Sequence, residues 1–188
     1  MNRLPYPRNV APEVQLLLDA RPPRNIFKMM AHAPALMPGL MELTGAILYR
    51  AKLDPISREL AVLRVGHLCG SHYEVGQHRK IAKAVGLSEE KIDAVVADVV
   101  KEEFFSQREK LVLRMAEEVV RNVKAPDALF AETVAAFGAE QTMELLIVIG
   151  TYVMLAQVLE NAEVQLEEGG GPAPEDVQKI FGNQASKK

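Results

Sequence analysis

Residues 58–86 read RELAVLRVGHLCGSHYEVGQHRKIAKAVG and hold the only Cys, three of the four His and the densest helix-like spacing of apolar residues in the chain. Asp54, just before this stretch, is a good helix N-cap residue. The apolar residues that follow it predict a buried helix of about four turns. Gly70 ends this helix, and Ser71 begins a second one that ends at Gly86, where a left-handed residue belongs.

The polar residues of this helical hairpin are candidates for a functional site. Glu74 and His78 are four residues apart, which places them on one face of a helix, close enough for the carboxylate to orient the imidazole. Glu59 lies in the first turn of the preceding helix, and antiparallel packing would bring it level with His78. The sequence therefore predicts a Glu–His–Glu cluster, with Arg64 and Arg79 near enough in sequence to neutralise it or to hold an anionic substrate.

The hairpin resembles the carboxymuconolactone decarboxylase family, whose relatives include the alkyl hydroperoxidase AhpD. The resemblance spans roughly residues 30–165, and its specific motif within 58–92 consists of Glu59, Leu63-Arg64-Val65, Tyr73-Glu74, His78, Ala82 and Gly86-Leu87-Ser88-Glu89. It implies an all-α, AhpD-like helical fold built around a central helical hairpin. It also implies a homo-oligomer, either a homotrimer or a hexamer made of two trimers.

The sequence departs from the redox branch of this family. In that branch the pattern is a Glu, eleven residues, a Cys, two residues, a Cys, three residues and a His. Glu59 and His78 fall in place, but the two Cys positions hold Ser71 and Glu74. Because the CxxC pair is absent, the chain resembles the decarboxylase-like branch. A further departure is Val75, where many such members have Trp after the Tyr-Glu pair.

The resemblance implies a cofactor-independent decarboxylase, a lyase that acts on a small anionic lactone or keto acid. Loss of CO2 leaves an enolate, so the site must hold anionic oxygens and deliver a proton to carbon. We expect His78 to donate the proton, Glu59 and Glu74 to orient it and tune its pKa, and Arg64 to clamp a carboxylate. Tyr73 is a candidate substrate contact, although a core aromatic ring with a bonded hydroxyl is its more ordinary role. No cofactor is expected, since the conjugated carbonyl of the substrate accepts the electrons.

Other interpretations remain open. Cys69 would serve a thiol-dependent hydroperoxidase or antioxidant protein, but an external thiol would have to resolve any sulfenic acid because the chain has no second Cys. A non-catalytic protein that binds small acids is another alternative. Glu74 and His78 could also be no more than a helix-surface pair. A metal site is not expected, because His67 and His72 face differently from His78 and form no i,i+4 pair.

The composition is that of an ordinary soluble globular protein. Its 188 residues suffice for one all-helical domain, which we place at residues 1–168, with 1–12 as an extended N-terminal arm and 169–188 as a flexible polar tail. The formal net charge of −3 and the dispersed cations argue against nucleic-acid binding. A single Cys, and no apolar segment behind a basic N-terminus, favour a cytoplasmic location.

The remaining helices are predicted from their start and stop signals. We expect them at residues 12–20, 25–32, 34–52, 88–99, 106–123, 127–137 and 140–168. The most apolar segment is Leu145–Leu159, which is shorter than the roughly 20 residues of a membrane span. Because such a segment must be buried all round, we predict an obligate homo-oligomer with Leu145–Leu159 at least partly at the interface and the pocket near His78 close to a subunit boundary.

Overall fold

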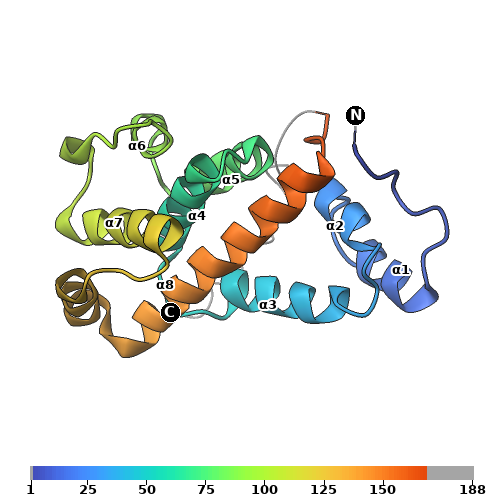
Figure 1. The fold of residues 1–188 in the computed structure, drawn as a ribbon, viewed down its shortest axis with the longest axis horizontal. Coiled ribbons are helices and arrows are strands. Elements are labelled where there is room, and N and C mark those ends of the chain that lie inside the picture. The colour runs from blue at the N-terminus through green and yellow to red at the C-terminus, as the bar shows by residue number, and fades with distance from the viewer. Residues whose placement is uncertain (1, 169–188) are drawn as a thin grey trace.

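The computed structural model describes residues 2–168. Every secondary-structure element assigned within this range is a helix, which confirms the all-α prediction. They are α1 (Pro12–Asp19), α2 (Asn25–Met30), α3 (Met37–Tyr49), α4 (Pro55–Leu68), α5 (His72–Ala84), α6 (Glu89–Val95), the short 3-10 helix η1 (Glu102–Phe104), α7 (Gln107–Asn122) and α8 (Asp127–Ala162). Helix α4 lies at the centre, where α5, α7 and α8 pack around it (Figure 1). The predicted hairpin, α4 followed by α5, is therefore the core of the fold.

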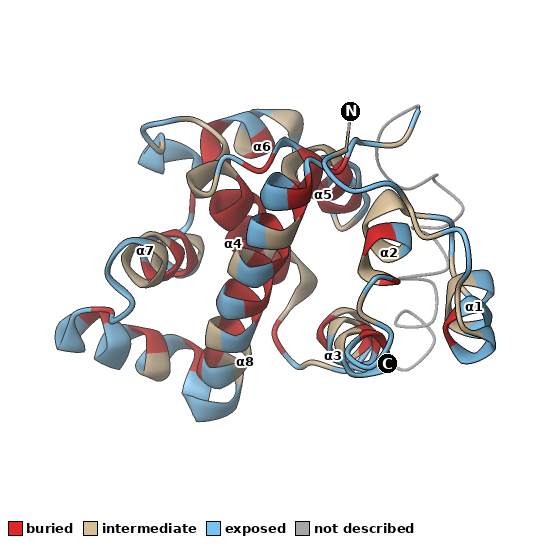
Figure 2. Ribbon diagram, turned by 45° about the vertical axis from the view of Figure 1, so that its right-hand side comes forward, coloured by how far each residue is buried: buried red, intermediate tan, exposed pale blue. Residues whose placement is uncertain are grey.

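Helix α4 is buried on all its sides. Every residue from 57 to 66 is buried, including the ionisable side chains of Arg58, Glu59 and Arg64 (Figure 2). The helix begins as predicted, since the Asp54 carboxylate accepts a hydrogen bond from the Ser57 amide at 2.9 Å. Charged groups at the centre of a core are costly unless they are paired, so their partners mark the places where the polar chemistry of this protein is concentrated.

A tight turn joins α4 to α5. Gly70 has φ +67°, and its amide donates to the His67 carbonyl at 3.0 Å, while the Ser71 amide donates to the Gly66 carbonyl at 2.8 Å. This pair of hydrogen bonds is the Schellman arrangement that ends a helix at a left-handed glycine. Gly66 also lets the two helices approach closely, because a methyl group added there would lie 3.3 Å from the Glu74 Cβ.

Several predicted helix boundaries are wrong in detail. Helix α3 begins at Met37 rather than at residue 34, because a turn occupies residues 33–36. Helices α6 and α7 end at Val95 and Asn122, so Val99 and Val123, which we expected on apolar helix faces, are both exposed. The predicted break at Gly138 is confirmed as a residue with φ 74° and ψ 168° inside α8.

Helix α8 crosses the hairpin with one face buried and the other exposed. It is long and apolar enough to cross a membrane by length and composition alone, and half of its most apolar window is buried within the structure. This chain alone does not bury Leu145–Leu159 on all sides, because Ile147 and Met154 are exposed while Val148 and Tyr152 are in the core.

The N-terminal arm and the segment after α8 lie side by side. The Arg3 amide donates to the Ala162 carbonyl at 2.9 Å, and the Arg3 guanidinium pairs with Glu163 at 2.9 Å. Helix α8 ends at Ala162 rather than near Glu168, since Glu163 adopts a left-handed conformation. Residue 1 and the predicted tail, 169–188, lie outside the described residues.

Candidate active site

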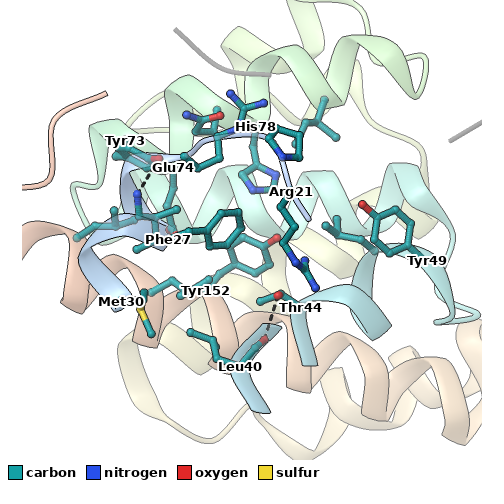
Figure 3. A pocket seen from close by; sticks show the side chains of 18 residues that line it. Arg21, Phe27, Met30, Leu40, Thr44, Tyr49, Tyr73, Glu74, His78 and Tyr152 are labelled. Atoms are coloured by element: carbon teal, nitrogen blue, oxygen red, sulfur yellow. Dashed lines mark hydrogen bonds between the residues drawn. The ribbon is translucent and has the colours of Figure 1, made fainter. Parts of the chain in front are cut away.

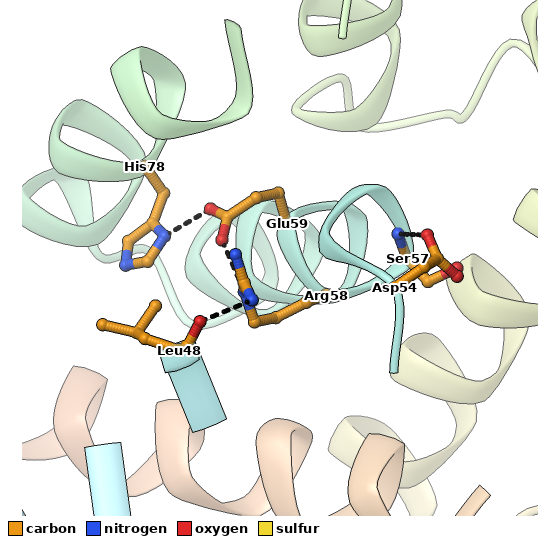
Figure 4. Close-up of polar contacts among 6 residues, drawn as sticks. All are labelled: Leu48, Asp54, Ser57, Arg58, Glu59 and His78. Carbon is orange, nitrogen blue, oxygen red and sulfur yellow. Dashed lines mark hydrogen bonds and ion pairs between the residues drawn. The ribbon is translucent and has the colours of Figure 1, made fainter. Parts of the chain in front are cut away.

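Glu59 and His78 meet inside the hairpin, as antiparallel packing of the two helices predicts. The Glu59 Oε2 atom lies 2.7 Å from His78 Nδ1, and the other oxygen, Oε1, accepts a hydrogen bond from Arg58 Nε at 2.9 Å (Figure 4). Arg58 in turn donates to the Leu48 carbonyl at 3.3 Å. Sequence reasoning had not singled out Arg58, because an arginine beside a glutamate on one helix does not ordinarily face the same way as its neighbour.

This network sets the charge of Glu59 and the tautomer of His78. Burial by itself raises the pKa of the fully buried Glu59 carboxyl, but the attraction and hydrogen bonds of His78 and Arg58 outweigh it and hold the net pKa below its ordinary value. An ionised carboxylate only accepts hydrogen bonds, so His78 Nδ1 is the donor in this pair. Nε2 points away from Glu59 (Figure 4) and is available for chemistry.

His78 lies in the wall of a mostly apolar pocket of about 180 Å³ (Figure 3). Helices α2, α3, α5 and α8 and the loop before α2 supply its lining, which consists of Arg21, Pro22, Arg24, Ile26, Phe27, Met30, Leu40, Thr44, Leu48, Tyr49, Tyr73, Glu74, Gln77, His78, Ile81, Tyr152, Leu155 and Leu159. A largely apolar cavity with a few convergent polar groups is the usual form of a small-molecule site.

Tyr152 packs directly against the candidate catalytic ring. The two ring centroids are 5.0 Å apart at an interplanar angle of 88°, an edge-to-face contact that holds the imidazole in place. Burial, together with the nearby Glu59 charge, raises the pKa of Tyr152, so the phenol stays neutral. Tyr152 was missed by sequence reasoning, because nothing in the apolar pattern of α8 distinguishes a residue that faces the site from one that faces the core.

Glu74 also lies in the pocket, but it does not orient His78 as we had expected. Its side chain is only 3% exposed, and neither carboxyl oxygen has a hydrogen-bond partner among residues 2–168. Burial, reinforced by the charge of Glu160, raises the pKa of Glu74 to about 9. The imidazole turns towards α4 and the ionised Glu59 instead, because an ionised carboxylate is the stronger acceptor. The predicted cluster is therefore a Glu–His pair with a second, neutral carboxyl group nearby.

Tyr73 lines the pocket with its ring while its hydroxyl is occupied. The hydroxyl donates to Glu167 at 2.7 Å and accepts from the Ile26 amide at 3.3 Å, and Gln77 donates to the other oxygen of Glu167. Burial and the hydrogen bond to Glu167 raise the pKa of Tyr73. Glu167 was not a candidate in the sequence, since we had placed it in the last turn of a long helix.

The two arginines that we had expected near the cluster lie elsewhere. Arg64 is buried on another side of α4, where it donates to Glu117 at 2.8 Å and to the carbonyls of Val95 and Ala97 at 3.0 and 2.7 Å. It is absent from the pocket lining, so the geometry does not support a carboxylate clamp at this position. Arg79 pairs with Glu89 at 2.6 Å and so ties α5 to α6.

The cationic groups that do line the pocket come from the loop before α2. They are Arg21 and Arg24, which sequence reasoning treated only as the break between two short helices. Arg21 extends into the pocket in Figure 3 and donates to the Met41 carbonyl at 3.3 Å. The tertiary fold, and not the local sequence, brings these side chains to His78.

Cys69 is half-buried at the end of α4 and is not part of the pocket lining. Burial, with a smaller contribution from Glu74, raises the pKa of its thiol above the ordinary value, which disfavours the reactive thiolate. Within residues 2–168, no three His, Cys, Asp or Glu side chains are grouped as metal ligands would be. His67 lies instead 3.3 Å from the exposed Asp98.

Comparison with known proteins agrees with this fold. The sequence model of the carboxymuconolactone decarboxylase family matches residues 34–118, which include Glu59, Glu74 and His78. No curated protein sequence matches the chain. A solved peroxidase-related protein with an alkylhydroperoxidase AhpD core, from Ralstonia eutropha, is similar with a TM-score of 0.76 and 17% identity, over 94% of this chain and 95% of that one.

Two other solved structures show the same fold. An uncharacterised peroxidase-related protein from a Silicibacter species has a TM-score of 0.75 and 14% identity, over 95% of this chain and 94% of its own. A protein of unknown function from Agrobacterium tumefaciens, described as a putative antioxidant defence protein AhpD, has a TM-score of 0.67 and 20% identity, over 77% of this chain and 95% of its own. At these identities the similarity establishes the AhpD-like fold alone.

Proposed function

Because residues 34–118 match the sequence model of the carboxymuconolactone decarboxylase family, we propose that this protein is a cofactor-independent lyase that decarboxylates a small lactone or keto acid. The observation that carries the proposal is the buried Glu59–His78 pair, whose histidine lies in the wall of an apolar pocket. A carboxylate that fixes one nitrogen of an imidazole leaves the other nitrogen free to transfer a proton.

In this mechanism His78 supplies the proton that replaces CO2. Glu59 holds the ring through Nδ1, while Tyr152 keeps it in position. The apolar lining favours loss of the carboxylate, because the charge that is concentrated on that group becomes spread over a conjugated enolate in the transition state. Arg21 and Arg24, at the loop side of the pocket, are the cations placed to attract an acid.

The peroxidase alternative has weaker support. Two structural relatives are described as peroxidase-related proteins, but a peroxidase built on this chain would depend on Cys69 alone. Its raised thiol pKa and its place outside the pocket lining both disfavour that chemistry. A non-catalytic small-acid binding protein is the remaining alternative, and it predicts binding without turnover.

The direct test is to incubate the protein with 4-carboxymuconolactone and to measure substrate loss and CO2 release. A His78→Ala variant should be slower by at least about 100-fold, the usual loss when a general acid is removed. His72→Ala is the matched control, because it removes an imidazole from the same helix outside the pocket. Equal rates for wild type and His78→Ala would refute the proposal, and peroxide consumption that is abolished by Cys69→Ala would establish the alternative.

We further propose that the protein is a homotrimer or hexamer that associates through the exposed face of α8. This face carries the apolar side chains of Met143, Ile147 and Met154, and water-exposed apolar stripes of this kind usually mark an interface. Met154→Asp, at a side chain that is 40% exposed, should dissociate the oligomer and leave the fold intact. Val148→Asp, at a position only 1% exposed, should instead unfold the chain. Light scattering that shows a wild-type monomer at micromolar concentration would refute the assembly.

A further inference from the structure

Glu74 occupies a capping position at the start of α5, yet it caps nothing. It is the third residue after Ser71, which is the spacing at which a serine and a glutamate can satisfy each other's amides. Instead, the Ser71 amide donates to the Gly66 carbonyl at 2.8 Å. The Ser71 hydroxyl and both Glu74 carboxyl oxygens are buried with no hydrogen-bond partner in the described part of the chain. The fold therefore makes no use of this carboxyl group.

Glu74 lies in the wall of the same pocket as His78. Glu74 lies one helical turn before His78 on α5, and both residues line the cavity (Figure 3). Leaving a buried polar group without a partner costs free energy, so an unpartnered group in a native structure calls for an explanation. A ligand in the cavity that carries a hydrogen-bond acceptor would provide the missing partner.

The protonation state of Glu74 identifies the kind of ligand atom. Burial, reinforced by the Glu160 carboxylate, raises the Glu74 pKa to about 9, so the group carries its proton at neutral pH and can donate an O–H. The other titratable groups that interact with it are the Tyr152 phenol and the Cys69 thiol, and burial keeps both neutral. Glu59 has the opposite state, an ionised acceptor. Two carboxyl groups held in opposite protonation states in one site can have different roles, the neutral one as a hydrogen-bond donor and the ionised one as an acceptor.

We propose that protonated Glu74 donates a hydrogen bond to an uncharged carbonyl oxygen of the substrate, the oxygen that gains negative charge when CO2 leaves. The pocket then selects acids whose carboxylate is on the carbon next to a ketone or lactone carbonyl, or on the saturated carbon at the far end of a C=C bond that is conjugated with that carbonyl. A simple carboxylate can accept the same hydrogen bond, but it must bring its charge into an apolar cavity near Glu59 and Glu160. This inference rests on the proposed decarboxylation and assigns the electron sink within it.

The bond between carbon and the carboxylate breaks, CO2 departs, and its bonding electrons form the C=C bond of an enolate whose oxygen accepts a hydrogen bond from the Glu74 O–H. His78 then gives its proton to the carbon, the C=O bond re-forms, and the imidazole takes a proton from water. One proton is consumed for each CO2 released. Glu74 keeps its own proton throughout, because it stabilises charge and does not transfer it.

The test uses two probes of equal ring size, the uncharged ketone 2-cyclohexen-1-one and the anion cyclohex-1-ene-1-carboxylate. Calorimetry should show that wild-type protein binds the ketone more tightly than the anion at pH 7, and that ketone binding weakens as pH rises through about 9. In the infrared spectrum, the ketone C=O stretch should move to lower frequency on binding. Glu74→Leu should abolish this movement and weaken binding by about tenfold, the value of one hydrogen bond.

Glu74→Gln is the matched variant, because an amide keeps a hydrogen-bond donor of the same shape and cannot ionise. It should retain part of the infrared shift and bind the ketone independently of pH. An unchanged infrared shift in Glu74→Leu, or tighter binding of the anion, would overturn the inference. His78→Ala separates the two claims, since it should lose turnover and still bind the ketone. If wild-type protein binds the ketone but does not turn over 4-carboxymuconolactone, the proposed decarboxylase activity is refuted and the Glu74 binding site is not.

Discussion

Two helices of this protein begin with the same four-residue pattern, Ser-x-x-Glu, but the pattern caps only one of them. At the start of α7, the Ser106 hydroxyl accepts from the Glu109 amide at 3.3 Å and Glu109 accepts from the Ser106 amide at 2.7 Å, which is a complete capping box. At the start of α5, Ser71 and Glu74 make neither bond. Because Glu74 does not cap α5, its carboxyl group is available to bind a ligand in the pocket.

The preceding chain decides which outcome occurs. Helix α7 follows an extended residue, so the Ser106 amide is free to be capped. Helix α5 follows α4 after a single turn, and the Schellman bonds that end α4 already use the Ser71 amide. The Ser71 ψ of 93°, against 164° at Ser106, also turns its hydroxyl away from the Glu74 amide. One residue cannot both complete the end of one helix and receive the cap of the next.

The strongest way to sharpen this contrast is to neutralise each glutamate and measure the free energy of unfolding. The folded-state pKa of Glu74, about 9, is above its unfolded value of 4.5, so the folded protein must hold a proton that the unfolded chain releases. The Glu74 contribution is therefore fully favourable below pH 4.5 and is lost as pH rises towards 9. Glu74→Gln should stabilise the protein by about 3 kcal/mol at pH 7 and by almost nothing at pH 4.

Glu109→Gln is the matched change and should have the opposite sign. Burial raises the pKa of Glu109, but hydrogen bonds from Lys91 and Ser106 outweigh this and hold the net pKa below its ordinary value. The variant should lose about 1 kcal/mol at neutral pH, and the loss should shrink on acidification as the wild-type carboxylate takes up its proton. Denaturant titrations at pH 4, 7 and 8.5 test both variants. A destabilised Glu74→Gln protein at pH 7 would contradict the neutral state of Glu74.

A second prediction concerns the turn that prevents capping of α5. Gly70→Ala should destabilise the fold by about 1 to 2 kcal/mol, because φ of +67° places a Cβ against the following carbonyl. Gly39→Ala is the control, since Gly39 is an exposed residue of α3 whose added methyl meets nothing within 4 Å. That variant should gain up to about 1 kcal/mol from helix propensity. Thermal unfolding distinguishes the two, and equal effects would show that the turn at Gly70 is not under conformational constraint.

The sequence predicted contacts between segments that are close together in the chain, and it missed contacts between segments that are far apart in the chain. The Glu59–His78 contact follows from helix periodicity and one tight turn, and both are visible locally. Arg64 was misplaced because it lies five residues after Glu59, which is a rotation of about 140° around the helix. Tyr152, Arg21 and the Glu167 carboxylate come from distant segments whose packing no local pattern specifies.

Glu74 shows a different limit. Its position beside the site was evident from the sequence, and its protonation state was not. That state depends on complete burial and on Glu160 from α8, both of which exist only in the folded chain. The same holds for the helix boundaries: the break at Gly138 was predictable from one residue, whereas Val99 and Val123 were misassigned because apolar spacing continues past the ends of α6 and α7.

The smallest expected effect is on the two serines, and it tests the comparison most directly. Ser106→Ala removes a hydroxyl that caps α7 and should cost about 1 kcal/mol. Ser71→Ala removes a buried hydroxyl that has no partner among residues 2–168, so no hydrogen bond is lost and the stability should change by less than about 0.5 kcal/mol or rise slightly. Both helices keep their lengths, so far-ultraviolet circular dichroism should match wild type and denaturant midpoints report the difference. If Ser71→Ala cost as much as Ser106→Ala, the hydroxyl would be capping α5 in solution and Glu74 would no longer be free to serve the pocket.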